Sequence, residues 1–365
     1  MIKVLFDYQI FYMQKYGGIS RYFANIQSCI AQQNGFQLKT SLLYHNNYYL
    51  KNTGVFSNNF GSILFKNKNN INKWNRRYSR LCLRANNFDV FHPTYYDPYF
   101  LPYLKKPFVL TVHDMIHELF PENFLASDVY SGYKKLCINK ADHIIAISET
   151  TKKDLQKFFD IADDKITVIH HGINSEQPVT EQVDGLPSQY LLFVGQRSGY
   201  KNFKVLAKAF ISIAQQHGDM HLVLAGGGKL SPAEEKFITS NSLEGRIHQI
   251  TATDEQLNTL YQKAACFIFP SLYEGFGLPI LEAFTNGCPM IVSDIACFRE
   301  IAEDSVAYFN PSDATKLVQS VNQLLESATL KNSLINGGYK QLKKFPLELA
   351  NEKTLNIYKM LSQSL

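Results

Sequence analysis

Residues 269–282 read FPSLYEGFGLPILE and place two carboxylates, Glu274 and Glu282, on either side of a glycine-rich turn. An apolar run precedes the turn, and a proline follows it, where the missing N–H of proline costs nothing in the first turn of a helix. The pattern predicts a short buried strand, a tight turn over 275–277 and a helix that begins near residue 278. A helix N-terminus carries unpaired N–H donors and roughly half a positive charge, so this turn predicts a site for a phosphate or another anion.

The two glutamates need a different partner, because carboxylates repel phosphate. An ionised carboxylate is a strong hydrogen-bond acceptor for neutral hydroxyl groups. A site that joins an anion position to such acceptors fits a nucleotide sugar, which carries both phosphates and hydroxyls. The alternative is an ordinary strand-to-helix turn with two surface glutamates.

The spacing of these glutamates resembles the donor-site signature of the retaining glycosyltransferases of family 4. The matching residues are Glu274 and Glu282 with seven residues between them, Pro270-Ser271 before them and Gly287 after them. The resemblance implies the GT-B fold, an α/β architecture of two Rossmann-like doubly wound domains that face each other across a cleft. It implies that Glu282 binds the ribose and that Glu274 orients the sugar. The other donor-binding residues that it implies here are Gly275, Phe276, Gly277 and Leu278.

Length and pattern also suit two domains. The 365 residues, 45% of them hydrophobic, can supply two cores. We predict a first domain over 1–173, a linker over 174–189, where prolines and a glycine interrupt the periodic pattern, and a second domain over 190–346. In the resembled fold the last helix crosses back to the first domain, and residues 347–365 are the candidate for it.

Strand-like runs alternate with helical ones along both halves, which predicts parallel sheets with helices on both faces. In the first half these runs lie at 3–6, 38–44, 62–65, 88–92, 108–113, 143–147 and 166–170. In the second half they lie at 190–194, 221–225, 247–251, 266–269, 290–293 and 306–309.

Cysteine use and hydropathy bear on the compartment. The six cysteines form no CxxC pair and mostly lie in apolar runs, as reduced core residues of a cytosolic protein do. The opening apolar run is interrupted at Asp7, too early for a signal peptide, and no apolar run approaches the ~20 residues of a membrane span. We therefore expect a cytoplasmic protein, either free or at the inner face of the cell membrane.

Positive charge is concentrated near the N-terminus. Residues 8–88 contain eleven lysines and arginines and no aspartate or glutamate, although the whole chain has a net charge of only +5. Within 66–84, Trp74 and Tyr78 alternate with cations, as in an interfacial helix on an anionic membrane. Nucleic acid is a competing partner, but no nucleic-acid motif accompanies the patch, and we expect none to bind. The remaining alternative is a solvated helix.

Two consecutive glycines, Gly17 and Gly18, follow the first predicted strand and open a helix with Arg21 in its first turn. Such a pair lets the backbone approach a phosphate closely, although it also occurs in ordinary loops. In the resembled family a glycine-rich loop at this place faces the donor diphosphate. The resemblance therefore implies that Gly17 and Gly18 bind the donor.

His113 stands at the end of a predicted strand, with His117 four residues later. A HExxH zinc motif needs glutamate directly after its first histidine and a helical setting, whereas Asp114 follows here. The chain also contains no D-x-D, so we expect no metal. The resemblance implies a catalytic His113 that hydrogen-bonds a sugar hydroxyl, and the alternative is a satisfied loop histidine.

Arg197 and Lys201 follow the first strand of the second half. A diphosphate leaving group carries about two negative charges, and fixed cations neutralise them best in a dry site. The pair resembles the family's diphosphate clamp, with one departure: Gln196 stands directly after the glycine, where the family most often has arginine. Arg197 is therefore a weaker match than Lys201, and two solvated cations remain the alternative.

The residues and the resemblance together predict a hexosyltransferase that uses a nucleoside diphosphate sugar and no cofactor, with a glycan or lipid-linked glycan as acceptor. The resemblance implies that the anomeric configuration is retained. The HDM of residues 113–115 and the YKN of 200–202 resemble mannosyltransferases of bacterial surface polysaccharide pathways, including lipopolysaccharide, so GDP-mannose is the first candidate donor. A nicotinamide-dependent Rossmann enzyme is an alternative, but neither half shows its G-x-G-x-x-G. A non-catalytic basic protein that binds a membrane or nucleic acid is the other.

Overall fold

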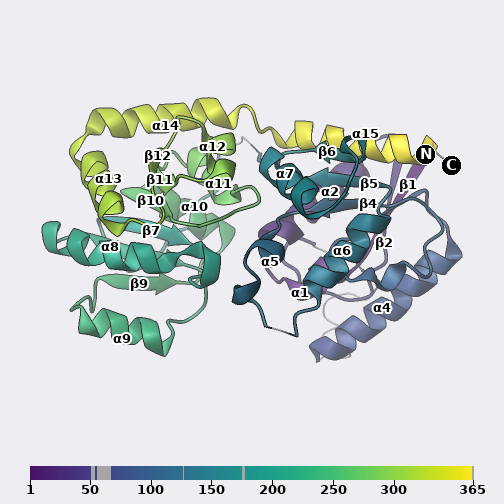
Figure 1. Ribbon diagram of the computed structural model, residues 1–365, viewed down its shortest axis with the longest axis horizontal. Helices are drawn as coiled ribbons and strands as arrows, with labels where there is room; N and C mark the ends of the chain where they lie inside the picture. The colour runs from purple at the N-terminus through teal and green to yellow at the C-terminus, as the bar shows by residue number, and fades with distance from the viewer. Residues whose placement is uncertain (51–53, 56–66, 126, 175–176, 364–365) are drawn as a thin grey trace. The chain divides into compact units, whose positions relative to one another are not determined.

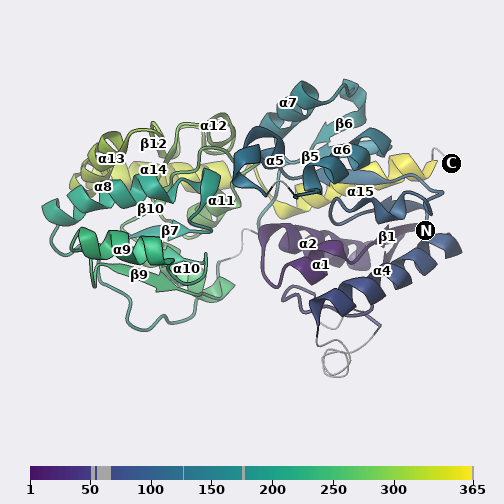
Figure 2. The same ribbon diagram turned by 60° about the horizontal axis from the view of Figure 1, so that its bottom comes forward.

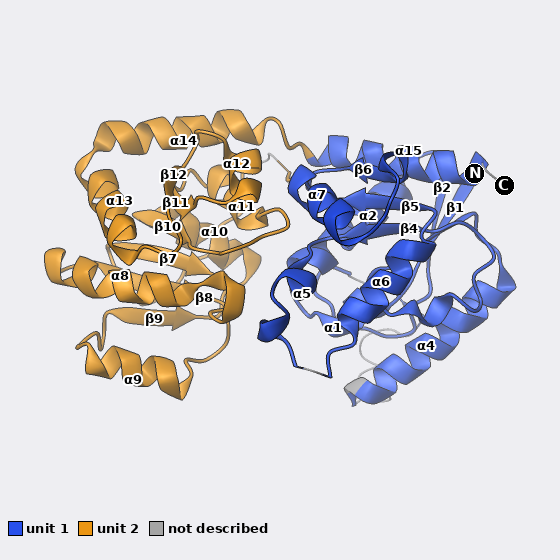
Figure 3. Cartoon of the chain, viewed as in Figure 1, with its two compact units in different colours: residues 1–172, 347–365 blue, residues 173–346 orange. Residues whose placement is uncertain are grey.

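The computed structural model divides into two compact units (Figures 1 and 3) and describes residues 1–50, 54–55, 67–125, 127–174 and 177–363. Unit 1 consists of residues 1–172 together with 347–365, and unit 2 consists of residues 173–346. All strand pairs among the described residues are parallel.

Unit 2 contains a six-stranded sheet with the order β12-β11-β10-β7-β8-β9. The chain builds outward from β7 to β9 and then returns to the other side of β7, so the strand order reverses between β7 and β10. In such sheets, ligands bind outside the carboxyl ends of the strands at this point. The strands are β7 (Tyr190–Val194), β8 (His221–Ala225), β9 (Ile247–Ile250), β10 (Cys266–Phe269), β11 (Met290–Ser293) and β12 (Ala307–Phe309).

Helices cover both faces of this sheet, which explains why its strands are apolar at nearly every position. Leu191 and Phe193 share a core with α8 and α13, whereas Phe267 and Phe269 pack against rings of α10 and α12 on the opposite face. The helices are α8 (Phe203–Gln216), α9 (Pro232–Ser240), α10 (Asp254–Lys263), α11 (Leu278–Thr285), α12 (Ala296–Ala302), α13 (Ala314–Glu326) and α14 (Ala328–Leu342).

Unit 1 contains two three-stranded sheets, with the orders β2-β1-β3 and β4-β5-β6. A single parallel bridge between Phe91 and Phe108 joins them. The strands are β1 (Ile2–Phe6), β2 (Phe36–Thr40), β3 (Val90–His92), β4 (Val109–Val112), β5 (His143–Ala146) and β6 (Ile166–Val168). The helices are α1 (Gln9–Met13), α2 (Gly18–Gln32), α4 (Lys68–Ala85), α5 (Ile116–Leu119), α6 (Tyr130–Lys140), α7 (Glu149–Phe158) and α15 (Leu347–Gln363).

The predicted strand over 38–44 is wrong at its C-terminal end, because β2 ends at Thr40. Beyond that residue the chain leaves the sheet: the side-chain oxygen of Asn75 accepts from the backbone N–H groups of Leu43 and Tyr44, so a helix side chain replaces the neighbouring strand. The strand predicted over 62–65 lies outside the described residues.

The stretch 174–189, for which the sequence predicts a linker, belongs to unit 2. The side chains of Asn258 and Thr259 in α10 donate to the backbone carbonyls of Val179 and Glu181 at 2.8 and 2.6 Å. The last helix, α15, belongs to unit 1. Its Tyr358 is fully buried there, and the hydroxyl lies 2.7 Å from Nδ1 of His92.

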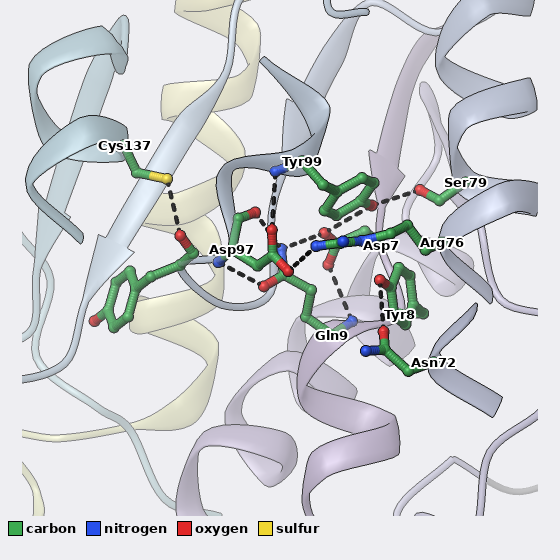
Figure 4. Close-up of polar contacts among 10 residues, drawn as sticks. Asp7, Tyr8, Gln9, Asn72, Arg76, Ser79, Asp97, Tyr99 and Cys137 are labelled. Atoms are coloured by element: carbon green, nitrogen blue, oxygen red, sulfur yellow. Dashed lines mark hydrogen bonds and ion pairs between the residues drawn. The ribbon is translucent and has the colours of Figure 1, made fainter. Parts of the chain in front are cut away.

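A buried polar network connects the ends of β1 and β3 to α4 (Figure 4). The carboxylate of Asp7 is fully buried and accepts hydrogen bonds from Thr94, Gln9 and Tyr99. Burial raises the pKa of Asp7, and the hydrogen bonds from Thr94 and Gln9 oppose that shift. Such a carboxylate is stable only while its partners remain in place, so the network fixes the local backbone.

Helix α4 lies along the outside of unit 1 (Figures 1 and 2) and is attached by polar side chains as well as apolar ones. Ser79 Oγ lies 2.7 Å from Ser41 Oγ and 2.6 Å from the hydroxyl of Tyr99, and Arg76 forms an ion pair with Asp97. The buried stripe Ile71, Asn75, Ser79 and Leu83 repeats every four residues, as one face of a helix does.

Candidate active site

Lys201 and Glu274 meet at the switch point of the unit 2 sheet. Lys201 ends the short helix η4 (Gly199–Lys201) that follows β7, and Glu274 lies in the turn that follows β10. The Lys201 ammonium donates to Oε1 of Glu274 at 2.6 Å. Only 17% of the lysine side chain and 11% of the glutamate side chain are exposed, so the pair is partly desolvated, and its charges interact more strongly than on an open surface.

Aromatic and hydroxyl groups hold this ion pair in place. The Lys201 ammonium lies 5.3 Å from the ring centre of Tyr200 and 5.5 Å from that of Phe269. Ser271 Oγ donates to the same glutamate oxygen at 2.7 Å. An ammonium has three donors, and this contact with Glu274 uses one of them. The remaining donors are chemically suited to phosphate oxygens.

The turn over 275–277 leads into α11, as the sequence predicts. Gly277 is the N-cap with φ of 100°, and a Cβ there would lie 3.1 Å from the Phe298 ring, so glycine is required. Gly277 has no side chain with which to cap this N-terminus, which follows β10 by way of the turn. The positive end of the helix therefore lies in the same turn as Glu274.

Glu282 lies one helical turn into α11 and is half-buried. The hydroxyl of Tyr261, on the neighbouring helix α10, donates to its Oε2 at 3.2 Å. Glu274 and Glu282 thus come from one turn-and-helix unit but have different partners. That difference is consistent with separate roles for the two carboxylates.

Arg197 makes contacts that the sequence did not predict. Its Nε donates to Glu234 at 2.7 Å, and its terminal nitrogens donate to the carbonyls of Gly226, Gly228 and Lys229. The side chain is only 5% exposed. Its guanidinium therefore binds the loop after β8 and the first turn of α9, whereas Lys201 binds Glu274.

Three residues near the pair make contacts that the sequence did not predict. Asn202 has a left-handed backbone (φ 53°), and its side chain donates to the carbonyls of Pro270 and Pro311, which fixes the end of β10. Ser271 stands only three residues before Glu274 in the sequence, and this closeness was a usable signal. Nothing in the sequence connects Tyr261 with Glu282, because that contact depends on how two helices pack.

Gly17 and Gly18 form the start of α2 in unit 1. The carbonyl of Gly17 accepts from the backbone of Arg21 and from Ser20 Oγ, while Oε1 of Gln14 accepts from the Ser20 amide at 3.3 Å. A Cβ on Gly17 would lie 2.3 Å from Oε1 of Gln14, so a larger residue there would displace this flexible side chain from its contact with the Ser20 amide.

His113 follows β4 in unit 1 and is 7% exposed. Its ring stacks on His171 with centres 5.9 Å apart, and its Nε2 is buried with no hydrogen-bond partner among the described residues. Burial, with smaller contributions from His92 and Lys134, lowers the pKa of His113 to about 3. The ring is therefore neutral at physiological pH and has an unused nitrogen.

A buried lysine, whose burial the sequence did not predict, binds the segment that follows His113. Lys134 of α6 has no exposed surface, and its ammonium donates to Oε2 of Glu118 at 2.9 Å and to the carbonyl of Asp114 at 3.1 Å. A fully buried lysine persists only when it is paired. This one links α6 to both the loop and the short helix α5.

Family models match most of the chain. The model described as "Glycosyltransferase Family 4" matches residues 16–177, and the model described as "Glycosyl transferases group 1" matches residues 181–341. The boundary between them lies close to the boundary between the two units.

Among curated proteins, the chain is 25% identical over 243 residues to the O-antigen chain mannosyltransferase RfbU of Salmonella typhimurium, covering 64% of this chain and 66% of that one. It is 26% identical over 282 residues to the O-antigen chain mannosyltransferase B of Escherichia coli, covering 73% and 74%.

Solved structures show the same fold at low identity. Sucrose-phosphate synthase from Thermosynechococcus elongatus aligns over 100% of both chains with a TM-score of 0.75 and 16% identity. Anabaena HepE, solved with UDP and glucose, aligns over 98% of this chain and 100% of its own with a TM-score of 0.73 and 17% identity.

Proposed function

Because this chain belongs to the family 4 type of glycosyltransferase, we propose that it transfers a hexose, with mannose as the first candidate, from a nucleoside diphosphate sugar to a hydroxyl group. The proposed acceptor is a glycan or a lipid-linked glycan of a surface polysaccharide, and the anomeric configuration of the sugar is retained. Two O-antigen mannosyltransferases among the relatives support the choice of sugar and pathway.

The observation that carries the proposal is the Lys201–Glu274 pair at the switch point between β7 and β10. It combines a cation, a helix N-terminus and a carboxylate, which are the three groups that a nucleotide sugar needs. Lys201 and the start of α11 stabilise the charge that develops on the leaving diphosphate. This cationic arrangement supports a mechanism without a metal ion.

The remaining polar groups bind and orient the donor. Glu282 accepts hydrogen bonds from the ribose, and Glu274 accepts from the sugar hydroxyls, in line with the different partners of the two side chains. Arg197 supports this site through the loop over 226–229, because its guanidinium already has four acceptors there. In unit 1, Gly17 and Gly18 are proposed to contribute to diphosphate binding.

His113 supplies a neutral hydrogen-bonding nitrogen and no general base. A group with a pKa of about 3 is a weak proton acceptor at neutral pH, but the buried Nε2 can still form a hydrogen bond with a sugar hydroxyl. We propose that an oxygen of the leaving diphosphate takes the acceptor proton. No dedicated basic residue is then required.

A thermal-shift panel with GDP, UDP, dTDP and CDP tests the donor class. A ligand at roughly a hundred times its Kd adds about 2.7 kcal/mol to stability, and we expect GDP to give the largest rise in Tm. The variant Glu282→Gln should lose most of that rise in Tm. The matched control, Glu235→Gln on the exposed surface of α9, should keep it. An equal rise in Tm with all four nucleotides, or no rise with any of them, contradicts the donor assignment.

We also propose that unit 1 docks on the cytoplasmic face of an anionic membrane through the outer face of α4. Trp74 is 47% exposed and Leu81 is 60% exposed on this helix, and exposed Lys73, Arg77 and Arg84 flank them. An aromatic ring and a leucine among cations suit the headgroup region of a bilayer. None of the described helices is long and apolar enough to span a membrane.

Vesicle co-sedimentation tests this docking. Each lysine or arginine near an anionic surface contributes about 1 kcal/mol, so the triple variant Lys73→Gln, Arg77→Gln and Arg84→Gln should release most of the bound protein. Arg76 is left unchanged because it pairs with Asp97. The control replaces Lys236, Lys340 and Lys343 of unit 2, which are all exposed. The docking model would be refuted if binding were the same with anionic and neutral lipid, at low and high salt, and for the wild type and the triple variant.

A further inference from the structure

A cavity of about 580 Å³ lies between α8 and α9 of unit 2, over β8 and β9. Its size is within the range of sites that hold small organic ligands. None of Lys201, Glu274, Glu282 and the turn over 275–277 lines it. It is therefore a separate feature from the donor site proposed above, and nothing in the family assignment gives it a role.

The interior of this cavity is apolar. Its walls are formed by Phe203 and Ala207 of α8, Leu224 and Ile247 of the sheet, and Phe237 and Ile238 of α9. The two α9 side chains are only partly buried. The apolar walls of this open cavity are in contact with water, so a ligand that fills it gains both contacts and burial.

The rim of the cavity is cationic. Lys204 and Lys208, one helical turn apart on α8, and Lys229 after the glycine loop all line it and are exposed. None of these three lysines forms an ion pair in the described parts of the chain. The only carboxylate among the lining residues, Glu234, already pairs with Arg197. The rim therefore has positive charge without a counter-ion.

We propose that this cavity is a binding site for a single-chain amphiphile with an anionic head group. The chain would fill the apolar interior, and a phosphate or carboxylate would contact Lys204, Lys208 and Lys229. A neutral apolar ligand would leave the rim unpaired, and a cationic one would be repelled by it. Because Arg197 and Ser198 form one wall and Lys201 follows three residues later, occupancy would also affect the segment that carries Lys201.

A fluorescent reporter can test this site without any transfer assay. Trp74 is the only tryptophan of the chain, so Phe237→Trp in a Trp74→Phe background places the sole indole in the cavity wall. Dodecyl phosphate should shift its emission in a saturable way. Dodecyltrimethylammonium and inorganic phosphate alone should not, because the first lacks the anion and the second lacks the chain.

Variants of the reporter locate the ligand. Lys204→Gln with Lys208→Gln should raise the half-saturating concentration about tenfold, since two contacts at an exposed, solvent-screened rim are lost, whereas the control pair Lys236→Gln and Lys343→Gln should not change it. Ala233→Phe, at an exposed position on the cavity wall, should block binding without disturbing the core. Far-UV circular dichroism checks that each variant is folded.

Several outcomes would overturn the proposal. They are an absent or unsaturable shift, an equal response to the cationic amphiphile, and binding that survives Ala233→Phe. Strictly competitive displacement, in which the half-saturating concentration of dodecyl phosphate rises without limit as GDP increases, would also overturn it, because the cavity would then belong to the donor site. Since none of these readouts requires turnover, failure here leaves the proposed transferase activity standing, and loss of transferase activity leaves this proposal standing.

Discussion

Replacement of Lys201 by alanine is expected to lower the rate of sugar transfer by a factor of about 10²–10³, the effect of removing one preorganised donor from a developing charge. The ammonium lies at the switch point with only 17% of its side chain exposed, so water cannot replace it well. Steady-state transfer from GDP-mannose to a glycan acceptor measures the loss. Lys236→Ala, an exposed lysine of α9, is the matched control and should retain full activity.

A structural cause for this loss can be separated from a catalytic one. Lys201→Ala leaves the carboxylate of Glu274 without its cation, which destabilises a mostly buried group. The double variant Lys201→Ala with Glu274→Gln removes that charge, so its Tm should recover while transfer stays low. EDTA should not abolish activity of the wild type. Complete loss with chelator, restored by Mg²⁺ or Mn²⁺, would contradict the metal-free mechanism.

Replacing Glu282 should mainly weaken nucleotide binding, whereas replacing Glu274 should mainly lower turnover. Glu282→Ala is expected to weaken nucleotide binding by about 1.5–3 kcal/mol, roughly ten- to a hundredfold, because charge-assisted bonds to the ribose are lost. Glu274→Ala should lower turnover strongly and leave the affinity for free GDP nearly unchanged. Calorimetric titration with GDP and single-turnover transfer separate these effects.

Two further variants control this comparison. Tyr261→Phe removes only the hydroxyl that orients Glu282, so it should weaken GDP binding less than Glu282→Ala. Glu235→Ala removes an exposed carboxylate of α9 and should change neither quantity. Wild-type transfer in both Glu274→Ala and Glu282→Ala would show that the site lies elsewhere.

The sequence predicted the fold of unit 2 better than that of unit 1, for a physical reason. Four strands of unit 2, including 190–194 and 266–269, have the predicted bounds. Strands that are covered on both faces appear in the sequence as uninterrupted apolar runs, which makes their ends easy to place. In unit 1, the strand predicted over 38–44 ends early, since a polar side chain of α4 takes the backbone groups. The GT-B class itself is confirmed by the family models and the structural likenesses.

The site was only partly accessible from the sequence. Lys201 and Glu274 were both named, but their contact follows from the pairing of β7 with β10, which no local pattern specifies. The partners of Arg197 depend on a glycine loop and on the first turn of α9, both distant in sequence. Lys134 gave no signal, because a lysine in a helix is normally exposed and only packing shows that it is buried.

The division of unit 1 between the two ends of the chain affects how the protein is made. Its core needs Tyr358 and neighbouring residues of α15, which the ribosome adds only after all of unit 2 has been synthesised. Unit 2 is continuous and can fold as it emerges, since domains generally fold as units during translation. Synthesis of unit 1 begins before that of unit 2 and ends after it. The incomplete core of unit 1, with the surface that α15 will cover still exposed, is therefore present throughout the synthesis of unit 2. That interval is when chaperones would find apolar surface to bind.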